Sequence, residues 1–256
     1  MSVFARFRAL PEQDKAALVR KLVESGTPDF DYFYLIGLST LMATLGLLLD
    51  SSAIVIGSML IAPLMYPVLG VALGLVMLGD TTTVIERAIN TLVKSLVIAL
   101  GLSVAAAFFF GDAASYETAE VMMRTIPSHL HLLVAVAAGA AVAYTLARPE
   151  WSDALPGVAI AVALLPPLAT VGVGLAAASA VIIKGAAMIF VLNLIGIIGI
   201  AVIIFLLMNL AEKENIAQST MKREEQKIES EQKVIEEVKR ELNGGDGTKE
   251  TPGSRS

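Results

Sequence analysis

Six apolar runs constrain the fold of this chain more than any other feature of its sequence. They cover residues 32–49, 52–78, 84–110, 131–148, 155–178 and 185–209. A hydrocarbon layer about 30 Å thick is crossed by about 20 apolar residues in a helix, so each run is long enough to span it. With 55% hydrophobic residues and a mean hydropathy of +0.72, the 256-residue chain is no water-soluble domain. We expect an all-α, polytopic membrane protein with six transmembrane helices.

The positions of Lys and Arg predict which side of the membrane each loop faces. Positive residues cluster before the first run, near the start of the third, after the fourth and after the sixth, whereas Arg124 and Lys184 lie at the opposite ends. Because cytoplasmic loops carry the excess of positive charge, both termini are predicted to be cytoplasmic. The N-terminal stretch lacks the continuous apolar core of a signal peptide, so the first span is expected to act as the insertion signal.

Two segments outside the apolar runs are predicted to form short helices. Residues 1–31 form a cytoplasmic amphipathic segment, in which a helix over 11–26 gathers four apolar side chains on one face, Leu18, Val19, Leu22 and Val23. We expect this face to lie on the inner membrane surface. Residues 111–130 form an outer loop with a short helix near 115–124, where Glu120 and Arg124 are spaced for a solvated ion pair.

The C-terminal segment changes abruptly from apolar to charged. Residues 211–242 are predicted to form a charged cytoplasmic helix, and 243–256 to be disordered. Met221, Ile228, Ile235 and Leu242 recur every seven residues, but Glu224 and Glu231 occupy half of the intervening core positions. The helix therefore either forms a weak coiled coil with a second copy or stays solvated.

The second apolar run contains the sequence IAPLMYP at residues 61–67, and the fifth contains Pro166 and Pro167. A proline inside a helix removes a hydrogen bond and disfavours the helix by about 3 kcal/mol. The carbonyls released in this way must find protein or water partners in the membrane. Both runs are therefore predicted to be broken helices, either closed by local packing or lining a polar cavity.

The two proline segments are also related by an internal match. Placing Pro63 and Leu64 over Pro167 and Leu168, 104 residues later, aligns four further residues of the same type. Each half then has a plain span, a proline-interrupted span and another long span, over residues 32–110 and 131–210. Since three spans is an odd number, the halves would insert with opposite orientation. We expect a 3+3 inverted repeat, in which paired interrupted helices mark the site of many transporters.

The candidate solute or ion path follows from these two segments. It consists of ten residues: Ala62, Pro63, Leu64, Met65, Tyr66, Pro67, Pro166, Pro167, Leu168 and Thr170. Tyr66 and Thr170 supply hydroxyl groups beside the prolines. Secondary polar candidates are Asp50 and Ser51, in the turn before the second run where Ser51 or Ser52 suits an N-cap, and Asn193 inside the sixth run.

No pattern in the chain points to catalysis or to a bound cofactor. The sequence has no cysteine, no phosphate-binding glycine loop and no nucleophile with a base at a shared membrane depth. His129 and His131 would form a metal pair only in an extended segment, because on a helix their side chains diverge. We expect no enzyme, no metal, no cofactor and no nucleic-acid partner.

The segment TLGLLLDSSAIVIGSMLIAPLM, residues 44–65, resembles the signature of a prokaryotic family of hydrophobic membrane proteins, domain of unknown function 389. The resemblance extends over about residues 30–210. Many members carry Asn where this chain has Asp50, which suggests that the turn needs a polar group rather than a charge. The family implies a location in the prokaryotic cell membrane and no established activity.

Two functions remain open at this point. One is a transporter or channel-like protein with its path at the paired proline segments, acting on an unknown small solute or ion. The other is a non-transporting oligomeric scaffold or sensor whose cytoplasmic helices recruit partners. In both cases we expect a homo-oligomer in the lipid bilayer, because repeated small residues such as Ala135, Gly139 and Ala143 let helices approach closely within or between protomers.

Overall fold

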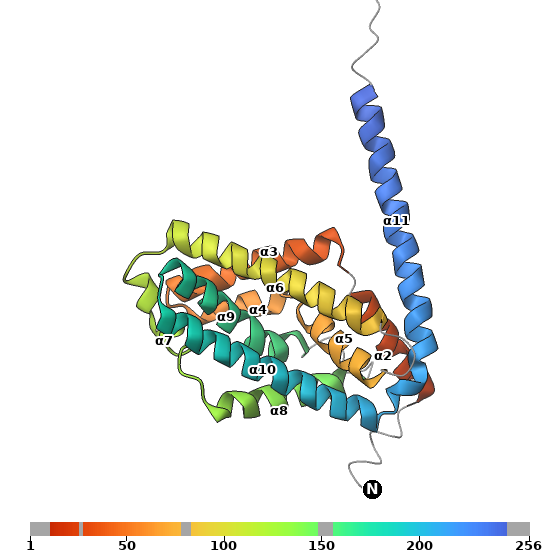
Figure 1. The fold of residues 1–256 in the computed structure, drawn as a ribbon, viewed down its shortest axis with the longest axis horizontal. Coiled ribbons are helices and arrows are strands. Elements are labelled where there is room, and N and C mark those ends of the chain that lie inside the picture. The colour runs from red at the N-terminus through yellow and green to blue at the C-terminus, as the bar shows by residue number, and fades with distance from the viewer. Residues whose placement is uncertain (1–10, 26–27, 78–82, 148–155, 245–256) are drawn as a thin grey trace, which may run out of the picture.

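The computed structural model of the chain describes residues 11–25, 28–77, 83–147 and 156–244 (Figure 1). These residues form ten α-helices and two short 3-10 helices, and contain no strand. The 3-10 helices are η1 (Ser115–Glu117) and η3 (Leu210–Lys213). The α-helices are α2 (Glu12–Ser25), α3 (Phe30–Leu48), α4 (Ser52–Ile61), α5 (Met65–Val76), α6 (Thr83–Phe110), α7 (Ala119–Met122), α8 (His129–Leu146), α9 (Pro156–Ala176), α10 (Ala180–Leu207) and α11 (Glu214–Gly244). The predicted all-α class is confirmed for this part of the chain.

The long apolar helices α3, α6, α8 and α10 run in roughly one direction, and short elements lie at the two ends of this bundle (Figure 1). α7 lies at one end, which we call the loop end. α2 and the start of α11 lie at the other, which we call the terminal end, and α11 projects away from the bundle there. The first ten residues and residues 245–256, most of the predicted disordered tail, lie outside the described residues.

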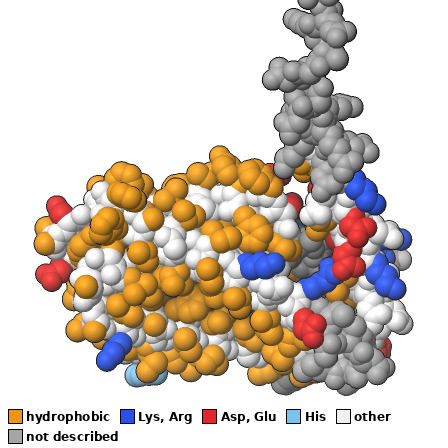
Figure 2. Space-filling model, turned by 45° about the horizontal axis from the view of Figure 1, so that its top comes forward, with side chains coloured by type: hydrophobic (Ala, Val, Ile, Leu, Met, Phe, Trp, Pro, Cys, Tyr) orange, Lys and Arg blue, Asp and Glu red, His pale blue; other side chains and the backbone are white. Residues whose placement is uncertain are grey.

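Four described helices are long and apolar enough to cross a membrane: α3, α6, α8 and α10. α4 and α5 together would make a fifth, with a bend of 55° between them. Large apolar side chains are exposed on these helices, among them Val97, Phe109, Leu133 and Ile195 at 60–76%, and one face of the bundle is largely hydrophobic (Figure 2). Such a surface suits lipid contact, and the apolar helices indicate a membrane protein.

α9 is the most enclosed of the apolar helices. It packs against α3, α4, α5, α6, α8 and α10. α6 in turn packs against α3 and α5, and α10 against α5 and α8. α6 and α10 therefore each contact both α9 and a helix of the α4–α5 pair.

The turn after α3 depends on a residue in the left-handed region. Asp50 has a φ of 51°, a conformation that Asp and Asn tolerate better than most residues. The next amide, Ser51 N, then donates to the Gly46 carbonyl at 2.9 Å, which closes the helix as a Schellman motif. A Cβ on Gly46 would lie 2.9 Å from the Val55 backbone nitrogen. Glycine is therefore needed for α3 and α4 to approach this closely.

The turn after α9 repeats this geometry. Ala178 has a φ of 52°, and Ser179 N donates to the Gly174 carbonyl at 2.9 Å. A Cβ on Gly174 would lie 2.9 Å from the Ile183 backbone nitrogen. The α3–α4 and α9–α10 hairpins therefore share one turn geometry and one close glycine contact.

From the sequence we expected the apolar face of the amphipathic helix α2 to lie on the membrane surface. In the structure this face is buried inside the protein instead. Leu18, Val19 and Leu22 are at most 2% exposed and belong to the main apolar core, because α2 packs against α5 and α11. Lys15 hydrogen bonds the Glu12 carboxylate, and together with Lys213 of η3 it lowers the pKa of Glu12 to about 2. The ion pair between Glu12 and Lys213 joins α2 to the start of the C-terminal segment.

The seven-residue apolar pattern of α11 is partly satisfied within the chain. Ala217 and Met221 are buried in the same core as α2, so they are not available to a second copy. Ile235 remains 53% exposed, next to Val234 at 58%. Coiled-coil pairing therefore stays a prediction for the outer part of α11 alone.

A glycine on α10 provides a direct test of this packing. A Cβ on Gly185 would lie 1.9 Å from the Thr125 carbonyl oxygen, whereas one on Gly199 of the same helix would meet nothing within 4 Å. We expect Gly185→Ala to lower the unfolding free energy by about 1–3 kcal/mol because the backbone must shift. Gly199→Ala should be neutral or stabilising by up to about 1 kcal/mol. Thermal unfolding in detergent distinguishes them, and equal stability of the two variants would contradict this packing.

Candidate functional site

The first proline segment is a true break between two helices. Ala62 has an extended backbone with a ψ of 117°, as expected of a residue that precedes proline. α5 begins at Met65, so Pro67 falls in its first turn, where amides have no partner within the helix. Both prolines therefore occupy positions that tolerate them, and the predicted broken helix is confirmed here.

The second proline segment is not broken, contrary to the prediction. α9 is continuous over Pro156–Ala176 with Pro166 and Pro167 inside it. The physical reason is its enclosure, since six helices, α3, α4, α5, α6, α8 and α10, contact α9, and such packing can maintain a proline-containing helix. The Thr170 hydroxyl donates to the Pro166 carbonyl at 2.9 Å, and Ser103 of α6 donates to the Ala169 carbonyl at 2.8 Å.

A cavity of about 210 Å³ reaches the first proline segment from the terminal end. Tyr66 and Pro67 of α5 line it, together with side chains of α2, α6 and α11. Arg87 and Lys94 of α6 contribute positive charge to its wall, and Arg87 forms an ion pair with Glu225 of α11. Charged side chains gather near this end of the molecule (Figure 2). We call this space the inner cavity.

A second cavity of about 220 Å³ reaches the other proline segment from the loop end. It is lined by Met123, Arg124, His131, Pro167, Ile189 and Asn193. Asn193, which carries a side-chain amide, is only 5% exposed. We call this space the outer cavity, and it shares no lining residue with the inner cavity.

Most of the remaining path residues are buried rather than on a cavity wall. Leu64 of the break belongs to the same apolar core cluster as Leu165 and Leu168 of α9. The predicted site residues thus separate into three groups: Tyr66 and Pro67 on the inner cavity, Pro167 and Asn193 on the outer cavity, and Ala62, Leu64, Met65, Pro166, Leu168 and Thr170 buried, with Pro63 half-buried. The structure brings the two segments together across an apolar contact.

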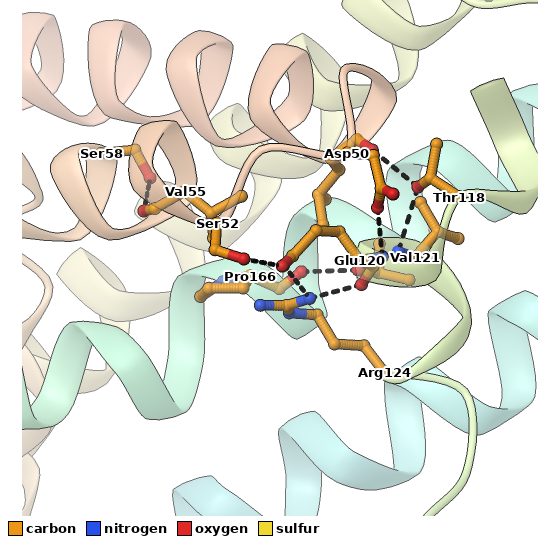
Figure 3. Close-up of polar contacts among 11 residues, drawn as sticks. Asp50, Ser52, Val55, Ser58, Thr118, Glu120, Val121, Arg124 and Pro166 are labelled. Carbon is orange, nitrogen blue, oxygen red and sulfur yellow. Dashed lines mark hydrogen bonds and ion pairs between the residues drawn. The ribbon is translucent and has the colours of Figure 1, made fainter.

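Glu120 and Arg124 form a buried polar cluster at the loop end, which the sequence did not predict (Figure 3). Glu120 is 4% exposed, so the pair is not the solvated contact that we expected. Arg124 Nη1 lies 2.7 Å from Glu120 Oε2, and Ser52 Oγ donates to the other carboxylate oxygen. The spacing alone gave no signal of burial, because the residues that cover Glu120 come from distant parts of the chain.

The α3–α4 turn is joined to the same cluster. Asp50 Oδ1 accepts a hydrogen bond from the Glu120 amide at 2.8 Å, and Thr118 Oγ1 donates to the Leu47 carbonyl at 2.7 Å (Figure 3). Asn could accept the same bond as Asp50, which agrees with a need for a polar group rather than a charge. Ser51 occupies the N-cap position of α4, as the sequence suggested, but its side chain forms no cap hydrogen bond.

The histidine pair lies in the first turn of α8. The Ser128 amide donates to His131 Nδ1 at 3.3 Å, as part of a capping box. Within the described ranges, no group of three or more His, Asp or Glu side chains is placed to hold a metal ion.

These features define an all-helical protein whose apolar helices suit a membrane and whose two proline segments each meet a cavity. The model of the family called domain of unknown function, DUF389, matches residues 59–220, and the chain belongs to this family. An uncharacterized protein of Methanocaldococcus jannaschii is 32% identical over 168 residues, which make up 66% of this chain and 51% of that protein. The chain thus spans about half the length of that relative. No solved structure matches it.

The buried pair leads to a stability prediction. Glu120→Gln leaves Arg124, whose side chain is 21% exposed, without its counter-charge, and we expect a loss of about 2–3 kcal/mol of unfolding free energy. The matched control is Glu117→Gln, since Glu117 is exposed on the neighbouring η1. Denaturant unfolding in detergent measures both, and a Glu120→Gln variant as stable as the control would contradict the cluster.

Proposed function

We propose that the protein is a transporter or channel-like protein of the prokaryotic cell membrane, with its solute path at the α4–α5 break and the proline segment of α9. The observation that carries this proposal is the pair of cavities, which approach the two proline segments from opposite ends. Paired sites of opposite access are what an inverted repeat produces in many transporters. The proposal includes no enzymatic activity.

A 3+3 inverted repeat of six spans is supported by the way the helices pack. If α3, α4–α5 and α6 correspond to α8, α9 and α10, the contact of α6 with α9 corresponds to that of α10 with α5, and both contacts are present. Each cavity also combines a proline of the second helix with an asparagine of the third: Pro67 with Asn90, and Pro167 with Asn193. The two halves would then supply equivalent polar sites that face opposite sides.

The proposed orientation has both termini in the cytoplasm. Support comes from the terminal end, where α2 and α11 lie together (Figure 1) and where Arg87 and Lys94 line the inner cavity. The inner cavity would then open to the cytoplasm and the outer cavity to the other side.

A scaffold or sensor is the second candidate, and one observation favours it. Leu64, Leu165 and Leu168 belong to one apolar core cluster, so apolar side chains pack where the two proline segments meet. In that case the break would serve packing, and the outer part of α11 would join copies into a homo-oligomer. A transporter instead needs this contact to open during its cycle.

Reconstituted protein tests transport directly. We expect flux of at least one solute from a broad panel of ions and metabolites into liposomes, together with a ligand-dependent thermal shift of the purified protein. Flux is compared between wild type, the destabilised Gly185→Ala variant and its matched control Gly199→Ala, each reconstituted in liposomes. A complete lack of both flux and thermal shift across the panel would support the scaffold.

Because the chain contains no cysteine, single cysteines can report the access of each cavity. We expect Asn90→Cys to react with a membrane-impermeant maleimide in inside-out vesicles, and Met123→Cys, on the outer cavity, to react in right-side-out vesicles. Leu165→Cys, at a fully buried position, is the protected control and should become reactive only with transported solute. Labelling of Asn90→Cys and Met123→Cys from the same side would refute the two-ended path.

A further inference from the structure

The polar wall of the inner cavity lies on one face of α6. Arg87, Asn90, Thr91 and Lys94 follow one another at helical spacings and all line the cavity. Tyr66 lies across from them on α5. The wall therefore offers guanidinium, ammonium, amide and hydroxyl donors to one common space.

The charge of this cavity is unbalanced. Its described lining residues include Arg87 and Lys94 and no Asp or Glu. The remaining wall is mostly apolar and includes Leu22, Leu73 and Ala88. Apolar walls of low dielectric strengthen the attraction between these cations and an anion, so the cavity favours a negatively charged ligand.

The volume of the cavity fits a polyatomic anion. One water needs about 10–15 Å³ of such space, whereas the inner cavity provides about 210 Å³. A phosphate group carries oxygens in several directions and accepts charge-assisted hydrogen bonds from Arg and Lys together. A planar carboxylate offers only two oxygens, and matches this many donors less well.

α11 already brings one anion to the edge of this cavity. Met221 and Ile228 of α11 line the cavity, and Glu225 lies between them on the same helical face. Its carboxylate forms the ion pair with Arg87. A ligand anion that binds Arg87 must therefore compete with Glu225.

We propose that the inner cavity binds a phosphate group through Arg87 and Lys94, and that Glu225 of α11 is an internal competitor for the same site. The phosphate would belong either to a free solute or to an anionic lipid headgroup, because the same donors recognise both. This inference rests on the proposed function in placing the ligand at the inner end of the path. Binding itself requires no transport, so the two proposals can fail separately.

Binding to the purified full-length chain tests this site. One arm titrates inorganic phosphate into protein in a neutral, phosphate-free detergent by calorimetry. The other compares thermal unfolding in nanodiscs of phosphatidylcholine with nanodiscs that also contain phosphatidylglycerol. Saturation by phosphate identifies a free solute, and stabilisation by phosphatidylglycerol identifies a headgroup; either supports the site. If wild type and Glu225→Gln respond in neither arm, the proposal is overturned.

Three substitutions and one control test which residues affect the affinity for phosphate, and in which direction. We expect Arg87→Gln to weaken binding by about tenfold or more, since a charge-assisted hydrogen bond is lost, and Lys94→Gln to weaken it less. Glu225→Gln should strengthen binding severalfold because the competitor is removed. Glu229→Gln, one helical turn further along α11 and also exposed, is the matched control and should bind like wild type.

The signs of these changes separate a specific site from general charge effects. Both Glu225→Gln and Glu229→Gln remove one negative charge from α11, so an equal gain in affinity for the two variants would overturn the competition. Unchanged affinity of Arg87→Gln, in protein whose unfolding midpoint matches wild type, would overturn the site itself. A phosphate response without solute flux would leave the site intact and count against transport only.

Discussion

Every backbone amide and carbonyl in an apolar environment needs a hydrogen-bond partner, and the arrangement of this molecule depends on how its prolines meet that constraint. At residues 62–64 the helix stops and restarts, and the start of α5 reaches the inner cavity through Tyr66 and Pro67. At Pro166 and Pro167 the helix continues because neighbouring helices enclose it. The loss of helix hydrogen bonds at proline thus leads to a break in one segment and to a continuous helix in the other, depending on the packing around each segment.

Polar contacts at the loop end hold the rest of the bundle around this core. Glu120 links Ser52 of α4 to Arg124, and its amide is bound by Asp50 of the α3–α4 turn. The loop that follows α7 is held so close to α10 that the Thr125 carbonyl leaves no room for a side chain at position 185. The outer cavity lies beside these contacts, so its shape depends on the buried ion pair. The inner cavity depends instead on α2 and α11, whose side chains form part of its wall at the terminal end.

Apolar periodicity located the helices well and said little about their partners. Among the described residues each of the six apolar runs is mainly helical, the second with a break at 62–64, and the helix predicted over 11–26 is α2. Proline chemistry predicted the α4–α5 break but also a break in α9, because a single sequence does not show how many helices surround a segment. The burial of Glu120 was missed for the same reason, since Ser52 and Asp50 are distant in sequence. Tyr66, Pro67, Pro167 and Asn193, which the sequence suggested for the path, each line one of the two cavities, whereas Arg87, Lys94 and Arg124 resemble ordinary interfacial charges in sequence and emerge only from the fold.

The central claim is that the helix is interrupted at the α4–α5 break, beside the inner cavity, whereas α9 stays continuous through Pro166 and Pro167. Hydrogen–deuterium exchange of the protein in nanodiscs measures this directly. The account predicts that the amides of Leu64, Met65 and Tyr66 exchange orders of magnitude faster than those of Leu168, Ala169 and Thr170, which lie inside a continuous helix. Equal, strong protection of both segments would contradict it, because the break would then be sealed from water.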